Sequence, residues 1–312
     1  MGCCTDPRRA LGMGPGSERS GGRGIVNIEI SADVNGSIGY AMCRSSVRII
    51  NSVSARNAGS SAIDELRITV TSEPPFMEAA EYVFGKVGPG KVVDAVIGDA
   101  ALDEDLLANI DGDLEGLVRI EAYADGIEIP AQIRPVTILP HNMWPGRDAP
   151  ELISAFIDPE SQTVRGMLRD ASDKLREAGE EEISYGYGDE DRNRRIIAAI
   201  HSAIRDREIG IEDTDGGRHN EGQRMRDAAE MDSDGDATRA EMATLFASVL
   251  ESAGLYPVLI FADEEILAGA WVIENRFPDA VIYDEQMLRE PVEKGELMLF
   301  STDSLSGTGP FT

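Results

Sequence analysis

The chain has 312 residues, of which 42% are hydrophobic, and its 57 acidic side chains outnumber 29 basic ones to give a net charge of −28. Since single domains usually contain roughly 100–200 residues, this length predicts two domains that each bury a core. The negative charge repels phosphate and the sequence has no basic patch, so we expect no direct binding to nucleic acid.

The first 23 residues predict a disordered tail, because they are rich in Gly, Arg, Ser and Pro and nearly lack apolar residues. Cys3 and Cys4 lie in this tail, and the third cysteine is Cys43. Three such cysteines predict no disulfide framework, which favours a reducing compartment. The opening MGCC resembles an acylation signal but has Asp6 where Ser or Thr is required. With no apolar run of roughly 18 residues and no secretory leader, we expect a cytoplasmic protein without membrane contact.

Residues 24–139 predict an antiparallel β-sandwich similar to an immunoglobulin or fibronectin type III module. Apolar and polar residues alternate in several short runs, which is typical of strands with one buried face. Asp125-Gly126 separates two such runs and predicts a hairpin turn. Modules of this kind usually bind or position a partner, so no catalytic role is expected here. The alternating apolar positions are Val26, Ile28, Ile30, Leu66, Ile68, Val70, Val118, Ile120 and Ala122.

Residues 140–150 contain three prolines and one glycine, and they predict a linker between the two domains. Trp144 lies in this segment. Because aromatic side chains bury large areas, we expect Trp144 to pack against a neighbour; the alternative is an exposed platform for a ligand.

Residues 151–312 show the period of helices and then that of strands, which predicts an α+β domain. One helical stripe runs from Val164 to Leu175 and a second from Ile196 to Ile204. A third helix is predicted over 238–253, with Gly254 as its stop signal. Strands are predicted over 256–261, 266–273 and 297–300.

Three acidic residues before the third helix raise the question of a calcium site. Asp232, Asp234 and Asp236 repeat the first half of an EF-hand loop, but Ala237 and Ala243 replace the Gly and the bidentate Glu that the second half requires. We therefore expect no metal site and no cofactor.

The start of the third helix contains the sequence Thr-Arg-Ala-Glu. Thr238 and Glu241 match the capping box, in which a hydroxyl and a carboxylate satisfy the free amides of the first turn. This structural role accounts for both residues.

The run ATRAEMATLFASVLESAGLYPVLIF, followed by EEILAGAWVI, resembles the transglutaminase-like domain found near the N-terminus of large bacterial superfamily I DNA/RNA helicases. The resemblance continues upstream through VRGMLRDASDKLRE, Gly222–Arg226 and SEPPF, and so covers nearly everything after residue 24. Within it, Ala237 and Thr238 stand on the family's Gly-Thr, Glu241 on its Asp, and Gly269–Trp271 on its Gly-x-Trp. The resemblance implies a transglutaminase-like, papain-like fold for residues 151–312.

The catalytic positions of that family are replaced in this chain. Its Cys position is Arg239, its His position is Glu265, and the third position is Ser301, with Asp303 two residues further on. Because the last cysteine is Cys43, a Cys-dependent reaction in this domain is excluded. We expect a degenerate site, with Arg239 and Glu265 facing each other as an ion pair. The residues expected to line this relic cleft are Arg239, Glu241, Glu265, Trp271 and Ser301.

A serine-dependent enzyme is the alternative chemistry, with Ser248 or Ser301 as the nucleophile. Neither serine lies in a Gly-x-Ser-x-Gly elbow. The three histidines, His141, His201 and His219, are expected in the linker, on a helix face and in a polar loop, so none is an evident base.

These observations favour a pseudo-enzyme that acts as a binding or scaffold protein for a protein or peptide partner. The alternative is an accessory subunit, or a truncated N-terminal part, of a superfamily I DNA helicase involved in DNA processing. Relatives in the resembled family carry helicase motors further along the polypeptide, whereas this sequence ends at Thr312 and contains no Walker-type phosphate loop. A helicase is therefore one candidate partner.

Overall fold

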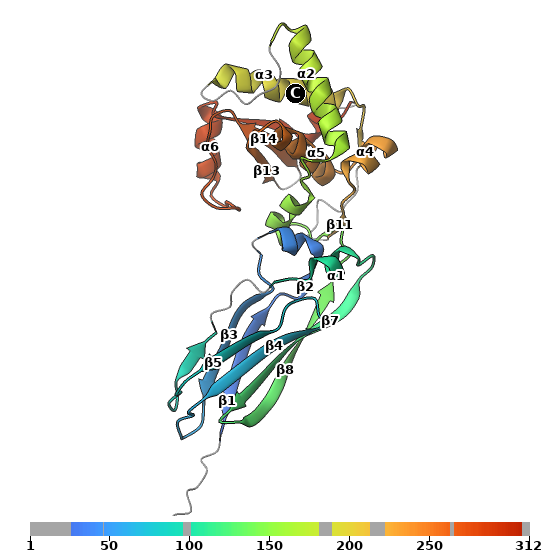
Figure 1. The fold of residues 1–312 in the computed structure, drawn as a ribbon. Helices are drawn as coiled ribbons and strands as arrows, with labels where there is room; N and C mark the ends of the chain where they lie inside the picture. Colours follow the sequence, from blue (N-terminus) through green and yellow to red (C-terminus); the bar gives the residue numbers. More distant parts are fainter. Residues whose placement is uncertain are drawn as a thin grey trace, which may run out of the picture.

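A strand-rich part and a helix-rich part follow one another along the chain (Figure 1). The computed structural model describes residues 26–45, 47–95, 101–180, 189–212, 222–262 and 265–307. The predicted tail lies outside the described residues, and so do Cys3, Cys4 and His219. Helices and strands occur together, which confirms the α+β class.

The strand-rich part contains two sheets. Every strand pair in them is antiparallel except β2 with β8, which is parallel. The larger sheet has the order β2 (Ser37–Ile38), β8 (Ile127–Ile138), β7 (Leu114–Ala124), β4 (Leu66–Glu73) and β5 (Ala80–Phe84). The smaller sheet has the order β1 (Ile28–Val34), β3 (Ile50–Asn57) and β6 (Val92–Asp94).

The alternation in the sequence corresponds to the buried faces of these strands. Ile68 and Val70 of β4 are fully buried and are paired with Ala122 and Ile120 of β7, which are also fully buried. The predicted turn at Asp125-Gly126 joins β7 to β8, and its φ angles of 49° and 77° are both positive. Such a turn follows the twist of the two strands, and glycine adopts it without a steric cost from a Cβ.

The segment predicted as a linker is packed between the two parts. Within it, β9 (Met143–Trp144) pairs antiparallel with β11 (Gln223–Arg224) of the helix-rich part. Trp144 is fully buried, stacks on Phe261 with 5.5 Å between ring centroids, and donates from Nε1 to the Ala149 carbonyl at 3.3 Å. The expected packing is confirmed, and the alternative of an exposed platform is wrong.

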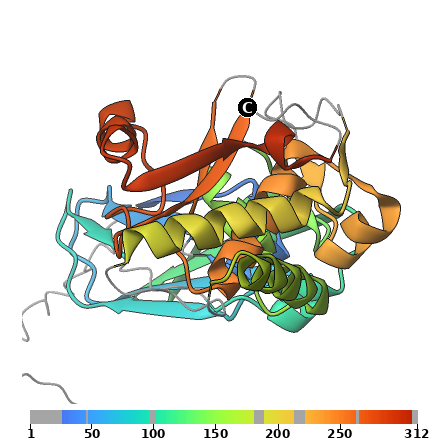
Figure 2. The ribbon, with the colours of Figure 1, turned by 90° about the horizontal axis from the view of Figure 1, so that it is seen from above.

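The helix-rich part places α5 (Arg239–Ser252) against the sheet β13-β14-β15 and against α2 and α3. In the view from above, α2 and α3 lie side by side (Figure 2). The predicted helices and strands are confirmed as α2 (Gln162–Glu177), α3 (Glu190–Arg205), α5, β13 (Pro257–Phe261), β14 (Ile266–Trp271) and β15 (Leu297–Ser301).

Strand β14 is the middle strand of this sheet, and all of its residues except Leu267 are buried. Ile266, Ala268 and Ala270 face the core beneath α5. Gly269 lies between them, and a Cβ there would fall 1.8 Å from the Met298 backbone oxygen of β15. Only glycine allows the two strands to approach this closely.

Several short elements are not predicted by periodicity, because they are too short for a repeat or contain proline. These short elements are η1 (Tyr40–Arg44), α1 (Glu104–Ala108), η2 (Pro150–Phe156), β10 (Gly210–Ile211), α4 (Ala228–Asp234), β12 (Asp236–Ala237), α6 (Glu285–Glu293) and α7 (Thr302–Leu305).

None of the helices within the described ranges is long and apolar enough to span a membrane.

Candidate functional site

The candidate site surrounds the first turn of α5, which is fixed by the predicted capping box. The Thr238 hydroxyl accepts from the Glu241 amide at 3.2 Å, and the Glu241 carboxylate accepts from the Thr238 amide at 2.8 Å. The helix then continues with every residue from Ala240 to Leu250 buried. The position of Arg239 is therefore set by local sequence, while the rigidity of the helix comes from packing on all sides.

Arg239 begins α5 and forms an ion pair with Asp303 of α7. The distance from Nε to Oδ1 is 3.2 Å, and the side chains of Arg239 and Asp303 are 22% and 45% exposed. Ser301 caps α7 by accepting from the Asp303 amide at 3.3 Å. The helix dipole disfavours a cation at this end of α5, and the Asp303 carboxylate offsets that effect.

The expected ion pair between Arg239 and Glu265 is wrong. Asp303 holds the guanidinium instead, and no ion pair of Glu265 is present among the described residues. Glu265 lies just before β14 begins and is only partly buried, whereas Asp303 on α7 reaches the guanidinium.

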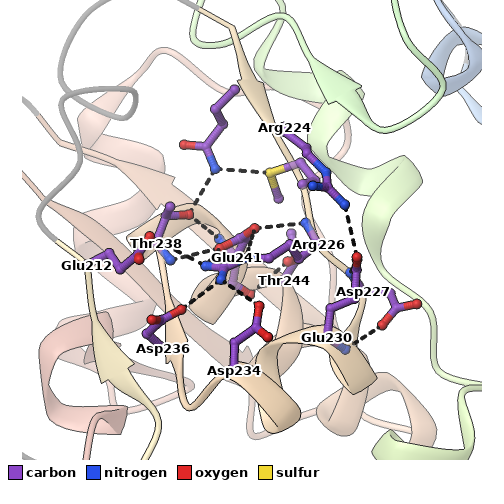
Figure 3. A network of polar contacts seen from close by, with 12 residues as sticks. Glu212, Arg224, Arg226, Asp227, Glu230, Asp234, Asp236, Thr238, Glu241 and Thr244 are labelled. Carbon is purple, nitrogen blue, oxygen red and sulfur yellow. Dashed lines mark hydrogen bonds and ion pairs between the residues drawn. The ribbon is translucent and has the colours of Figure 1, made fainter. Parts of the chain in front are cut away.

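A network of charged groups surrounds Arg226 next to this turn (Figure 3). Arg226 donates to the Glu241 carboxylate from its backbone amide at 2.8 Å and from Nη2 at 2.9 Å. Its Nη1 lies 2.7 Å from Asp236 and 3.2 Å from Asp234, and its Nη2 lies 3.6 Å from Glu212. The hydrogen bond to Glu241 is the main reason that the pKa of Arg226 is raised above its ordinary value.

The same contacts explain the acidic residues that resemble half of an EF-hand. Asp234 and Asp236 bind the Arg226 guanidinium, and Asp232 lies 3.2 Å from Arg207. Arginine side chains thus occupy the place that a bound cation would take. Within the described ranges, no three His, Cys, Asp or Glu side chains are arranged to hold a metal ion.

The residues expected in the relic cleft are not all together. In the register between β14 and β15, Leu267 is opposite Ser301, whereas Trp271 is opposite Leu297. Trp271 therefore lies about 13 Å further along the sheet, at roughly 3.3 Å per residue. Arg239, Glu241 and Ser301 share one end of the helix-rich core. Trp271, which is 3% exposed, packs instead against Phe277 with ring centroids 5.1 Å apart.

The serines considered as nucleophiles both have structural hydrogen bonds. Ser248 is 3% exposed, donates to the Thr244 carbonyl at 2.7 Å and accepts from the Asp158 amide at 3.0 Å. Ser301 caps α7, as described above. Both hydroxyls therefore take part in hydrogen bonds that hold local structure.

His201 of α3 is close to a different serine. Its Nε2 lies 3.1 Å from the Ser304 hydroxyl, which donates to the Ser301 carbonyl at 2.7 Å. Ser304 is 1% exposed, and the imidazole packs against the rings of Phe246 and Phe300. His201 and Ser304 thus form a buried polar contact between α3 and α7.

We expect acidification to weaken the fold through His201. Burial, and secondarily the charge of Arg205, lowers the pKa of His201 below 6.5, so the unfolded chain takes up the proton first. The free energy of unfolding therefore falls as pH decreases through 6.5. Urea unfolding at pH 7.5 and 5.5 should show a smaller loss for His201→Gln, which cannot titrate; an equal loss in both proteins would contradict this.

Sequence reasoning missed three residues of the site. Gln223 donates from Nε2 to the Thr238 hydroxyl at 2.8 Å, Arg226 binds Glu241, and Thr302 is fully buried beside Asp303. The only signal for the first two is their place in the run Gly222–Arg226. Nothing in the sequence around Thr302 indicates its burial.

Neither a known protein-family model nor a curated protein matches the sequence. No family is therefore assigned to the chain. The resemblance to a transglutaminase-like domain and the geometry around α5 are the basis of a proposal for its function.

Proposed function

We propose that this chain is a non-enzymatic binding or scaffold protein whose binding site lies at the first turn of α5. The ion pair between Arg239 and Asp303 supports this function most directly. A guanidinium already bound to a carboxylate stands where the resembled family has a thiol nucleophile. Because arginine stays protonated in proteins, it serves neither as a nucleophile nor as a general base.

The proposed architecture is an immunoglobulin- or fibronectin III-like sandwich followed by a degenerate transglutaminase-like domain. Two observations support it: the pair of sheets in residues 28–138, and a buried helix, α5, that precedes an antiparallel sheet of three strands. We propose a protein or peptide partner in the reducing cytoplasm. The resemblance makes a superfamily I helicase, for which this chain would be an accessory part, the first partner to test.

Affinity capture with the full chain tests this function when it is combined with a charge exchange at the site. We expect wild type to capture a partner that Arg239→Glu loses, because the variant places two carboxylates opposite each other at the helix start. Arg289→Glu is the matched control, since Arg289 pairs with Glu285 on the surface of α6 and its side chain is 63% exposed.

Two outcomes would contradict the proposal. One is a partner that binds wild type and Arg239→Glu equally. The other is hydrolysis of peptides, or incorporation of amines into proteins, by the purified chain, with loss of that activity in Arg239→Glu.

A further inference from the structure

Carboxylates are in large excess over cations in this chain. The 57 acidic side chains face only 29 basic ones, so at least 28 carboxylates cannot be paired one to one. Like charges in such excess repel one another and destabilise the compact state. Of the basic residues 25 are arginine and only four are lysine, namely Lys86, Lys91, Lys174 and Lys294.

One long stretch of the chain has no cation at all. Between Lys91 and Arg119 the sequence contains eight acidic residues and no lysine or arginine. Seven of the eight are described residues; all seven are exposed, and none is paired with a lysine or arginine within the described ranges. These carboxylates therefore repel one another without an ion pair to hold them. They belong to Asp94, Asp103, Glu104, Asp105, Asp111, Asp113 and Glu115.

The carboxylates of this stretch act on the residues next to them. The short helix α1 packs against η1 (Figure 1), and the Glu104 carboxylate accepts a hydrogen bond from the Tyr40 hydroxyl at 3.2 Å. Burial raises the pKa of the Cys43 thiol to about 11, and the negative charges of Glu104 and Asp103 contribute to this rise. The surplus charge is thus felt between neighbouring elements of the fold.

Ion pairs on the surface do little to compensate for this repulsion. In the pairs Arg56–Glu29 and Arg289–Glu285, all four side chains are at least 54% exposed. Exposed pairs of this kind contribute little to stability, and solvent ions screen them.

Dissolved salt also screens the repulsion between carboxylates. The Debye length falls from about 8 Å at 0.15 M salt to about 3 Å at 1 M, so molar salt removes most of the repulsion between charges on neighbouring elements. Contacts at hydrogen-bond distance, such as the 2.9 Å contact from Arg226 to Glu241, are shorter than this length and persist. Screening therefore weakens the repulsion in this chain more than the attraction.

We propose that this protein is adapted to molar salt, in which monovalent cations such as K⁺ screen its surplus carboxylates and stabilise the fold. The preference for arginine over lysine agrees with this proposal. A guanidinium binds a carboxylate through a fixed fork of N–H donors, whereas a lysine ammonium is a strongly hydrated point charge. The inference is independent of the proposed binding function, because it concerns the medium in which the fold is stable.

Thermal unfolding of the full chain in about 0.1 M and 2 M KCl tests the proposal. We expect Tm to rise by at least about 10 °C in the higher salt, because repulsion between carboxylates in the folded chain is lost. The proposal is overturned if Tm stays the same or falls. It is also overturned if millimolar CaCl₂ alone gives the whole rise, because a specific cation site would then be responsible.

Charge variants separate screening from the general effect of salt on apolar burial. Asp94→Asn combined with Asp113→Asn and Glu115→Gln removes three unpaired charges. This triple variant should raise Tm in 0.1 M KCl by at least about 2 °C and should gain less than wild type in 2 M KCl. Lys86→Gln with Lys91→Gln is the control of opposite sign, since the Lys86 side chain is 72% exposed and its loss removes no packing.

The double lysine variant should have a lower Tm than wild type in 0.1 M KCl and should gain more in 2 M KCl. If all three proteins gain the same number of degrees between the two salt concentrations, salt acts on apolar burial and the proposal is wrong.

Discussion

Replacing Arg226 with Met is expected to lower the free energy of unfolding by about 3–5 kcal/mol, because it leaves a buried carboxylate without its partner. The side chain of Glu241 is 1% exposed, and that of Arg226 is 16% exposed. Solvent cannot replace the two hydrogen bonds that the guanidinium gives this carboxylate. Chemical unfolding of the purified variant in urea would measure the loss.

Two further variants test whether this loss of stability comes from the unpaired buried carboxylate or simply from the removal of one positive charge. Arg56→Met removes the surface pair with Glu29, whose side chains are 54% and 58% exposed, and should cost at most about 1 kcal/mol. Adding Glu241→Gln to Arg226→Met removes the unpaired charge and should restore part of the loss. Equal losses for Arg226→Met and Arg56→Met would show that the network does not stabilise the fold.

We expect Trp144→Ala to lower the free energy of unfolding by about 3–5 kcal/mol, the usual cost of truncating a fully buried aromatic side chain. The change removes the ring that stacks on Phe261 and the hydrogen bond to Ala149. It also empties space next to the pairing of β9 with β11. The loss should appear in thermal and urea unfolding alike.

Trp144→Phe and Tyr283→Ala are the controls for this result. The first keeps an aromatic ring against Phe261 and should lose less than Trp144→Ala. The second truncates a ring that is 87% exposed, so its effect should stay within about 0.5 kcal/mol. If Trp144→Ala also stays within that range, Trp144 contributes little to the stability of the junction.

Local rules predicted those parts of the fold that depend on neighbours in sequence. The start of α5 follows from a hydroxyl and a carboxylate three residues apart, and the hairpin at Asp125-Gly126 follows from two residues that tolerate positive φ. The strands β13 to β15 were recognisable as apolar runs. In each of these cases the determining contacts lie within a few residues.

The candidate site could be predicted only in part, because its contacts join residues that are distant in sequence. Arg239 finds its partner 64 positions later, in Asp303. Glu265 is only 26 positions from Arg239 but forms no ion pair with it, and single-sequence periodicity does not show which carboxylate reaches the start of α5. Arg226 binds acids on both sides of α4, and only the folded chain brings these together.

The burial of α5 on all sides has a consequence for its dynamics. Backbone amides from Met242 to Leu250 should exchange with deuterium only when the whole domain opens, and so they should be among the slowest in the chain. A ligand at the first turn of such a helix meets groups that are already ordered. Little conformational entropy is lost on binding, and the affinity depends chiefly on how well the ligand fits.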